Sequence, residues 1–233
     1  MKKLYILFFC YFLNTNGQTV STFAGSTEGF TDGIGTSAQF NGPAGLDFGP
    51  DGNLYVADRV NHRIRKITPS GVVTTIAGSA EGFADGAGTN ALFNSPMNLT
   101  VDNNGIIYVA DSGNNRIRKI MPDGTVTTLT GSTEGFADGT VSNALFYSPE
   151  GIFITTNGII YIGDTGNQRI RKIMPDGTVI TLAGGTLGNV DGIGTAAQFW
   201  SPCRLTVDYN GTVFVTEKKN RIRKITDSGV VTT

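Results

Sequence analysis

The sequence has few of the residues from which most metal centres and nucleophilic sites are built. Among 233 residues there are two cysteines and a single histidine, His62. Catalytic zinc needs a cluster of protein ligands, usually several imidazoles or thiolates. The chain also lacks the Gly-x-Ser-x-Gly turn that presents a nucleophilic serine. We therefore expect a protein that is not an enzyme, and we interpret His62 as an ordinary turn residue.

Long apolar runs are scarce as well, and the one that stands out lies at the N-terminus. Lys2 and Lys3 precede an apolar stretch over residues 4–13, and polar residues 14–17 follow it, which is the pattern of a secretory signal peptide. The stretch is too short to span a bilayer. We predict that residues 1–17 are a signal peptide, with an uncleaved anchor as the weaker alternative. The protein is then secreted, either extracellular or periplasmic, with no stable membrane insertion after cleavage.

Cleavage would leave Cys203 as the only cysteine, so no internal disulfide is expected. An excess of charge is also missing, because the formal net charge is −1. A nucleic-acid partner, which normally requires a strongly basic face, is therefore not expected. Twelve of the 18 Lys and Arg residues lie in four copies of Arg-Ile-Arg-Lys. We interpret these as packed strands with charged heads that reach water or nearby aspartates. The alternative is a ring of cations for phosphate or glycan.

What the chain has in abundance is repetition. Ala110–Ile120 recurs at residues 57–67 and 163–173 and, in altered form, at residues 216–225. The repeats lie near residues 20–72, 73–125, 126–178 and 179–230, with a period of about 53 residues. A period in this range indicates a propeller, a solenoid or an array. The 32 glycines suit a fold of many tight turns.

One repeat shows the expected local structure. Short β-branched stretches at residues 73–77, 97–102, 106–110 and 116–121 predict four strands. Turns rich in Asn, Asp and Gly separate the last three. A long connection over residues 78–94 contains at most one helical turn, near Thr89. Ile117 and Ile120 point to opposite faces of their strand, so both faces must be buried. We therefore predict an all-β fold, a β-propeller of four-stranded antiparallel blades. A β-helix is the alternative, although its repeat is usually shorter.

The repeated pattern resembles the NHL repeat. The motif Asp-x-x-Asn-x-Arg-Ile-Arg-Lys-Ile is preceded by Pro-x-x-Leu-x-Val-Asp-x-x-Gly-x-Ile-Tyr-Val-Ala, and the resemblance covers residues 20–233. The longer connection is similar to that of secreted bacterial NHL proteins and of the NHL region of teneurins. The resemblance implies a propeller that typically has six blades, so we expect these four repeats to be part of a larger one. The alternative is a closed four-bladed ring in which residues 19–23 complete the last blade.

Strand direction assigns to one face of the disc the long connections and the turns such as residues 111–115, which join the strands at 106–110 and 116–121. We call this face the loop face, and rigidly held long loops make it the candidate binding face. It is rich in acids, which makes calcium a possible cofactor because Ca²⁺ prefers oxygen ligands; otherwise no cofactor is expected. The weak calcium candidates are Asp32, Asp85, Asp138 and Asp191.

The repeats differ from one another directly after the proline that opens the innermost strand. In a propeller these residues line the mouth of the central channel, where unequal residues are the better candidates for a specific site. The predicted ligand-binding residues there are Met97, Asn98, Glu150, Trp200 and Arg204. Drift at a solvated position is the competing interpretation.

Three functions are compatible with these observations. We favour a secreted, non-catalytic propeller that binds an extracellular or envelope protein or a glycan. A scaffold that spaces other domains is closely related to it. The alternative is a propeller hydrolase or lyase, similar in fold to gluconolactonases or peptidyl-hydroxyglycine lyases, with its site at the channel mouth.

Overall fold

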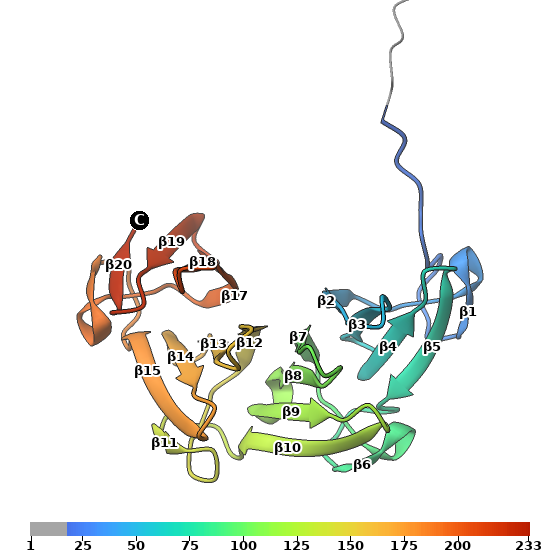
Figure 1. The fold of residues 1–233 in the computed structure, drawn as a ribbon, viewed down its shortest axis with the longest axis horizontal. Coiled ribbons are helices and arrows are strands. Elements are labelled where there is room, and N and C mark those ends of the chain that lie inside the picture. The colour runs from blue at the N-terminus through green and yellow to red at the C-terminus, as the bar shows by residue number, and fades with distance from the viewer. Residues whose placement is uncertain (1–17) are drawn as a thin grey trace, which may run out of the picture.

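The computed structural model describes residues 18–233, so the predicted signal peptide lies outside the described residues. Four antiparallel sheets are arranged around a common centre as the blades of a β-propeller (Figure 1). The predicted fold class is therefore confirmed. No helix in residues 18–233 is long and apolar enough to cross a membrane.

Each blade has five strands rather than the predicted four. The additional strand is a two-residue segment of the long connection, and it pairs with the outer edge of the last strand of its blade. Blade 1 contains β1 (Gly33–Ile34), β2 (Pro43–Phe48), β3 (Leu54–Asp58), β4 (Arg63–Ile67) and β5 (Val72–Ala77). Blade 2 contains β6 (Gly86–Ala87), β7 (Pro96–Val101), β8 (Ile107–Asp111), β9 (Arg116–Ile120) and β10 (Thr125–Gly131). Blade 3 contains β11 (Gly139–Thr140), β12 (Pro149–Ile154), β13 (Ile160–Asp164), β14 (Arg169–Ile173) and β15 (Thr178–Gly184). Blade 4 contains β16 (Gly192–Ile193), β17 (Pro202–Val207), β18 (Val213–Glu217), β19 (Arg221–Ile225) and β20 (Val230–Thr232).

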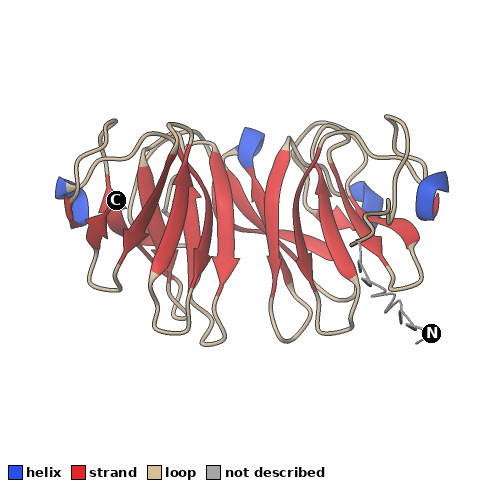
Figure 2. Ribbon diagram, turned by 90° about the horizontal axis from the view of Figure 1, so that it is seen from above, coloured by secondary structure: helices blue, strands red, loops and turns tan. Residues whose placement is uncertain are grey.

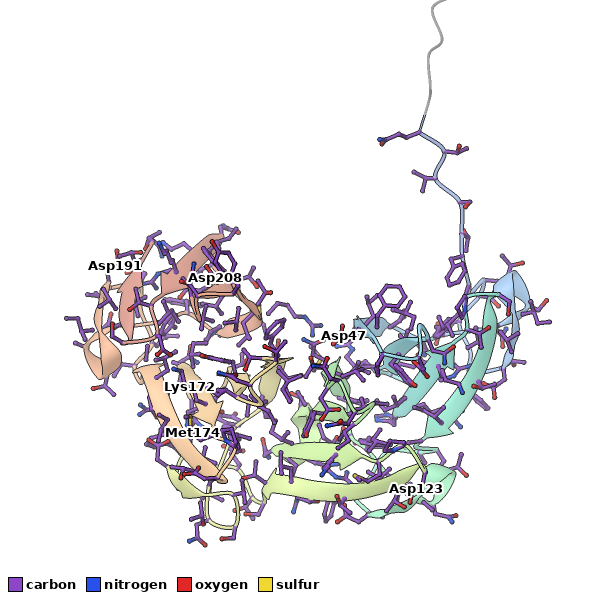
Figure 3. The ribbon with its side chains drawn as sticks, viewed as in Figure 1. Asp47, Asp123, Lys172, Met174, Asp191 and Asp208 are labelled. Carbon is purple, nitrogen blue, oxygen red and sulfur yellow. The ribbon has the colours of Figure 1, made fainter. Side chains whose placement is uncertain are left out.

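Within each blade the order from rim to centre repeats without change. In blade 2 it is β6-β10-β9-β8-β7, so β7 is the innermost strand. Three long connections contain a short 3-10 helix: η1 (Gly35–Ser37), η2 (Gly88–Asn90) and η4 (Gly194–Ala196). The helical turn that the sequence predicted near Thr89 is η2. A further 3-10 helix, η3 (Ser112–Asn114), follows β8. Figure 2 shows the long connections on one side of the disc and the short hairpins on the other, as expected from strand direction. In Figure 3, Asp47 marks the inner edge of blade 1 and Asp191 the outer edge of blade 4.

The hydrophobic core lies between the blades. Ile120 belongs to a cluster shared by blades 1 and 2, and Ile117 to a cluster shared by blades 2 and 3. Both side chains are fully or almost fully buried. The expectation that residues three apart serve opposite faces is confirmed. A third cluster joins blades 3 and 4.

The four blades form an arc and not a closed ring (Figure 1). The strand at the rim of blade 4 is β16, which pairs with β20, and residues 19–23 pair with no strand in the described part of the chain. The alternative in which residues 19–23 close a four-bladed ring is therefore wrong. The end faces of the arc expose apolar residues that are buried elsewhere: Leu46 of blade 1 is 63% exposed, whereas its equivalent Leu99 is 2% exposed. The larger blade number implied by the family resemblance stays a prediction.

Candidate functional site on the loop face

A fully buried arginine organises the long connection of every blade. In blade 2, Arg118 Nη1 donates to Asp111 Oδ2 (2.8 Å) and to the carbonyl of Leu92 (2.9 Å). Its Nη2 donates to Asp85 Oδ1 (2.7 Å) and to the carbonyl of Ala84 (2.7 Å). One guanidinium thereby ties the end of β8 to two points of the long connection. The other members of this set, which we call the arginine nodes, are Arg65, Arg171 and Arg223.

These nodes confirm one of the two environments expected for the Arg-Ile-Arg-Lys strand. We expected charged heads that reach water or nearby aspartates, and the second arginine of each copy reaches aspartates from a fully buried side chain. Its charge is balanced inside the blade by two carboxylates, one buried and one half-exposed. Burial raises the pKa of Asp111, and hydrogen bonds from Asn114 and the Asn94 amide, together with Arg118, oppose that rise. The nodes are part of the scaffold that holds the loop face.

The four calcium candidates belong to these nodes. Asp85 Oδ1 accepts from Arg118 and from the Thr128 hydroxyl (3.1 Å), and its Oδ2 accepts from the Thr128 amide (3.1 Å). Asp32, Asp138 and Asp191 make the corresponding bonds in their own blades. Among residues 18–233 no three acidic, His or Cys side chains gather around a common point. A calcium ion would have to displace the arginine and threonine donors, so we do not propose one.

Half-exposed phenylalanines form a second repeated feature of the long connections. Phe83 is 46% exposed, and the guanidinium carbon of Arg116 lies 3.8 Å from its ring centroid. Phe136 with Arg169 and Phe30 with Arg63 repeat the arrangement at 3.8 Å and 4.2 Å. In blade 4 Asn189 takes the place of the phenylalanine. We call these three pairs the Phe–Arg stacks. A cation over an aromatic face is attractive, so each ring is held in place while part of it faces solvent.

At the channel mouth, Arg204 of β17 reaches the innermost strands of all three other blades. Its Nη1 donates to the carbonyl of Met97 (2.7 Å) and, at 3.5 Å, to that of Glu150, while its Nη2 donates to the carbonyl of Ala44 (3.2 Å). Burial lowers the pKa of Arg204, and the charge of Glu150 opposes that effect. The structure thus brings together Met97, Glu150 and Arg204, as the sequence predicted. It also shows that Arg204 donors are used on backbone carbonyls.

The other predicted residues have separate surroundings. The nearly buried Glu150 accepts from Lys218 Nζ (2.6 Å), a half-exposed cation that sequence reasoning did not single out. Asn98 directs its amide towards the carbonyl of Ile152 at 3.5 Å. Trp200 belongs to a different cluster, because Lys219 Nζ lies 4.4 Å from its ring centroid and its backbone amide donates to Glu217.

Two glycines explain part of the variation that the repeats show here. The position of Asn98 and Arg204 is occupied by Gly45 in blade 1 and Gly151 in blade 3. A Cβ on Gly45 would lie 2.5 Å from Asn98 Cα, and one on Gly151 would lie 2.2 Å from the carbonyl oxygen of Cys203. Glycines and larger residues therefore alternate around the axis, since the innermost strands approach too closely for a side chain at every position.

We expect Gly151→Ala to destabilise the protein by about 1–3 kcal/mol, because the new methyl group pushes β12 away from the backbone of β17. Urea unfolding followed by circular dichroism measures the loss. Asn98→Ala is the matched control, since it shortens a side chain at the same repeat position and adds no clash. Equal stability of Gly151→Ala and the unmodified protein would contradict the packing argument.

A family model described as the NHL repeat matches residues 40–67, 93–120 and 146–173. These stretches span the three inner strands of blades 1, 2 and 3. The chain belongs to the NHL-repeat β-propeller family. The fourth blade of this NHL-repeat protein has the same strand order although its motif is altered.

Relatives of this NHL-repeat protein occur in proteins of different kinds. Protein SUPPRESSOR OF QUENCHING 1, chloroplastic, of Arabidopsis thaliana is 33% identical over 176 residues, which cover 70% of this chain and 15% of that protein. NHL repeat-containing protein 2 of Gallus gallus is 29% identical, with 68% and 24% covered. Teneurin-4 of Homo sapiens is 26% identical, with 56% and 6% covered. The chain thus spans less than a quarter of the length of each of these relatives.

Solved structures give the same fold. A streptogramin B lyase superposes with a TM-score of 0.58 at 20% identity, with 83% of this chain and 54% of that chain covered. An auxiliary nutrient binding protein from Bacteroides ovatus superposes with a TM-score of 0.65 at 19% identity, with 81% and 49% covered. At these identities the likeness shows the fold alone.

Proposed function

We propose that this chain is a secreted, non-catalytic NHL-repeat propeller that binds an extracellular or envelope protein, or a glycan, through its loop face. The observation that supports this most is the set of Phe–Arg stacks. Exposed aromatic rings that are already held in one conformation lose little entropy on binding. Aromatic and arginine side chains are also the residues most often found at the energetic centre of an interface.

The arginine nodes support the same proposal because they fix the backbone of each long connection. Loops that are held rigidly by the scaffold offer a preformed surface. At the channel mouth, Glu150 is paired with Lys218 and Arg204 is bonded to carbonyls. Neither group is left as a free base or nucleophile, so we favour binding over the hydrolase or lyase alternative. Secretion rests on the sequence pattern of residues 1–17.

The test is a binding screen of the domain comprising residues 18–233 against glycan arrays and panels of secreted and envelope proteins. We expect the triple variant Phe30→Ala, Phe83→Ala, Phe136→Ala to bind its partner at least about tenfold more weakly, since each substitution removes exposed aromatic area and its cation contact. Asn103→Ala, on the opposite face, is the control. Glu150→Ala forms a second arm that tests the channel mouth.

The outcomes separate the alternatives. Binding that is lost in the triple variant and kept in the control supports the Phe–Arg stacks. Binding lost only in Glu150→Ala would move the site to the channel mouth. A screen without any partner would overturn the binding proposal and leave the scaffold role. Turnover of any compound by the domain would contradict the non-catalytic assignment.

A further inference from the structure

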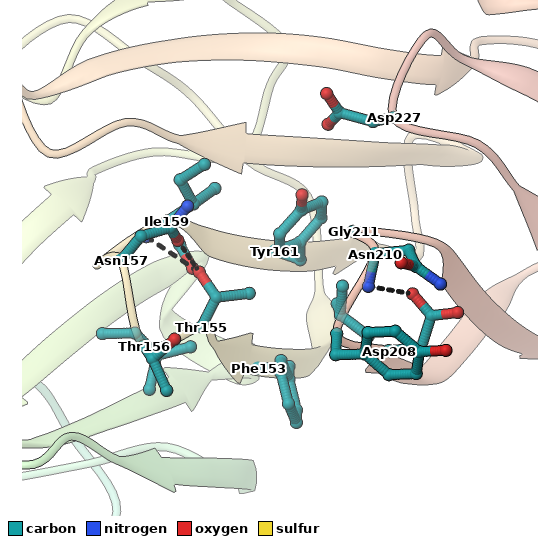
Figure 4. A pocket seen from close by; sticks show the side chains of 13 residues that line it. Phe153, Thr155, Thr156, Asn157, Ile159, Tyr161, Asp208, Asn210, Gly211 and Asp227 are labelled. Atoms are coloured by element: carbon teal, nitrogen blue, oxygen red, sulfur yellow. Dashed lines mark hydrogen bonds between the residues drawn. The ribbon is translucent and has the colours of Figure 1, made fainter.

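Each junction between blades has a cavity on the hairpin side of the disc, of about 240 Å³ between blades 1 and 2 and about 410 Å³ between blades 2 and 3, and the junction between blades 3 and 4 differs from them in its lining residues. A cavity of about 470 Å³ lies there, lined from blade 3 by residues 153–157, Ile159 and Tyr161 and from blade 4 by residues 207–211 and Asp227 (Figure 4). This size is in the range of small-molecule sites. The cavity is on the face opposite the Phe–Arg stacks.

Three residues that line the cavity have no counterpart in the other repeats. Phe153 replaces Asp47, Thr100 and Thr206 of the other innermost strands. Tyr209 stands where the sister turns have Pro50, Asn103 and Thr156, and Asp227 stands where they have Pro69, Pro122 and Pro175. Differences from three separate places in the sequence therefore meet in one cavity.

Phe153 also changes how the blades are joined. In the first junction Asp47 Oδ2 accepts from the Val101 amide (2.9 Å), and in the second the Thr100 hydroxyl accepts from the Ile154 amide (3.4 Å). A phenylalanine cannot make this bond. Phe153 lines the cavity instead and packs against the hydrophobic cluster between blades 3 and 4.

Tyr161 supplies the polar group that points to a ligand. Its sister Tyr55 donates its hydroxyl to Asp51 (2.9 Å), and Tyr108 directs its hydroxyl to Asp102 (3.5 Å). In blade 3 the carboxylate of Asp102 is replaced by Thr155, which bonds to Asn157 and Ile159. Within the described residues, blade 3 has no bond equivalent to these for Tyr161, whose side chain is 2% exposed and whose hydroxyl keeps access to solvent at the cavity. A ligand in the cavity can replace water as the partner of this hydroxyl.

The charges of the cavity narrow the class of ligand. Asp208 Oδ1 accepts from the amides of Asn210 and Thr212, and Asp227 pairs with the nearly buried Lys172. Two carboxylates and one ammonium leave an excess of one negative charge, which disfavours an anionic ligand. Aromatic rings beside carboxylate and amide groups suit a ligand with one apolar face and several hydroxyls.

We propose that this cavity binds a neutral hexose, either free or as the terminal residue of a glycan. The apolar face of the sugar packs against Phe153 and Tyr209. The Tyr161 hydroxyl donates to a sugar oxygen, and Asp208 Oδ2 accepts from a sugar hydroxyl. The site is separate from the loop face, so it can be present or absent whatever binds there.

The experiment is a titration of the isotope-labelled domain of residues 18–233 with glucose, galactose, mannose and glucuronic acid, followed by two-dimensional NMR of its amides. We expect a neutral hexose to shift the amides of residues 153–161 and 207–211, and glucuronic acid to bind more weakly. Tyr161→Phe should weaken binding about five- to tenfold, because it removes one hydrogen bond and keeps the ring. Tyr209→Ala should weaken it by a similar factor, and its 97% exposed side chain is not needed for folding.

Tyr108→Phe is the matched control, since it deletes the sister hydroxyl in blade 2, and binding should not change. The proposal is overturned if no neutral hexose shifts these amides, if glucuronic acid binds equally well, or if Tyr161→Phe and Tyr209→Ala leave the affinity unchanged. Comparing a free hexose with a glycan that ends in it identifies the source, and shifts of the same amides by either one support the site.

Discussion

Replacing Arg118 by methionine is expected to destabilise the protein by about 3–5 kcal/mol, because it leaves the buried carboxylate of Asp111 without its cation. The same substitution removes the donors to the carbonyls of Leu92 and Ala84. The long connection of blade 2 should therefore loosen as well. Urea unfolding measures the stability, and limited proteolysis within residues 84–94 reports on the connection.

Two further variants make this prediction specific. Arg116→Met removes the neighbouring arginine, which stacks on Phe83 from a partly exposed position, and should cost about 1 kcal/mol or less. The double variant Arg118→Met, Asp111→Asn should recover part of the loss, since no buried charge remains. A loss as small as that of Arg116→Met would contradict the role of the arginine node.

The pH dependence of Arg118→Met provides an independent check. Burial already raises the pKa of Asp111 in the folded protein, and removal of Arg118 raises it further. A carboxyl whose pKa is higher in the folded protein than in the unfolded chain is more fully protonated in the folded state between these two pKa values. The free energy of unfolding therefore decreases as pH rises through that range. The difference in the free energy of unfolding between the unmodified protein and Arg118→Met should therefore become smaller as pH falls from neutral towards the pKa of aspartate in the unfolded chain. A constant deficit would contradict the assignment to Asp111.

Much of the fold could be predicted from the sequence because the repeats are local and nearly self-contained. The alternation of β-branched residues with Asn, Asp and Gly turns predicts four strands per repeat, and Ile117 with Ile120 predicts a sheet buried on both faces. The fifth strand could not be predicted in the same way. Gly86–Ala87 has no strand-like pattern and pairs with β10 only because the arginine node holds the connection alongside it.

The sites were less accessible to sequence reasoning than the fold. The differences between repeats at the channel mouth predicted that Glu150 and Arg204 lie close together, as they do. Spacing alone does not predict that Arg204 donates to three backbone carbonyls. The hexose cavity was missed because the repeats were compared only next to the opening proline. The same comparison at Phe153, Tyr209 and Asp227 would have marked those three positions, although only the structure shows that they face one another.

The ends of the arc allow the contribution of blade packing to be measured within one molecule. Ile117 of β9 and Ile222 of β19 are the second residues of equivalent strands. Ile117 is fully buried against blade 3, whereas Ile222 is 65% exposed. We expect Ile117→Ala to destabilise the protein by about 2–5 kcal/mol. Ile222→Ala should cost less than about 1 kcal/mol, mostly from the lower strand propensity of alanine.

Because both substitutions remove the same atoms from the same strand position, the difference between them isolates burial against the next blade. Urea unfolding under identical conditions measures both. Equal losses would mean that Ile222 is covered by another molecule in solution, or that the blades unfold independently, and unfolding at several protein concentrations separates the two. In the first case the loss from Ile222→Ala depends on concentration, because association then contributes to stability. If the blades unfold independently, the loss from Ile222→Ala does not depend on protein concentration. Each blade would then be a unit that packing against its neighbours stabilises only slightly.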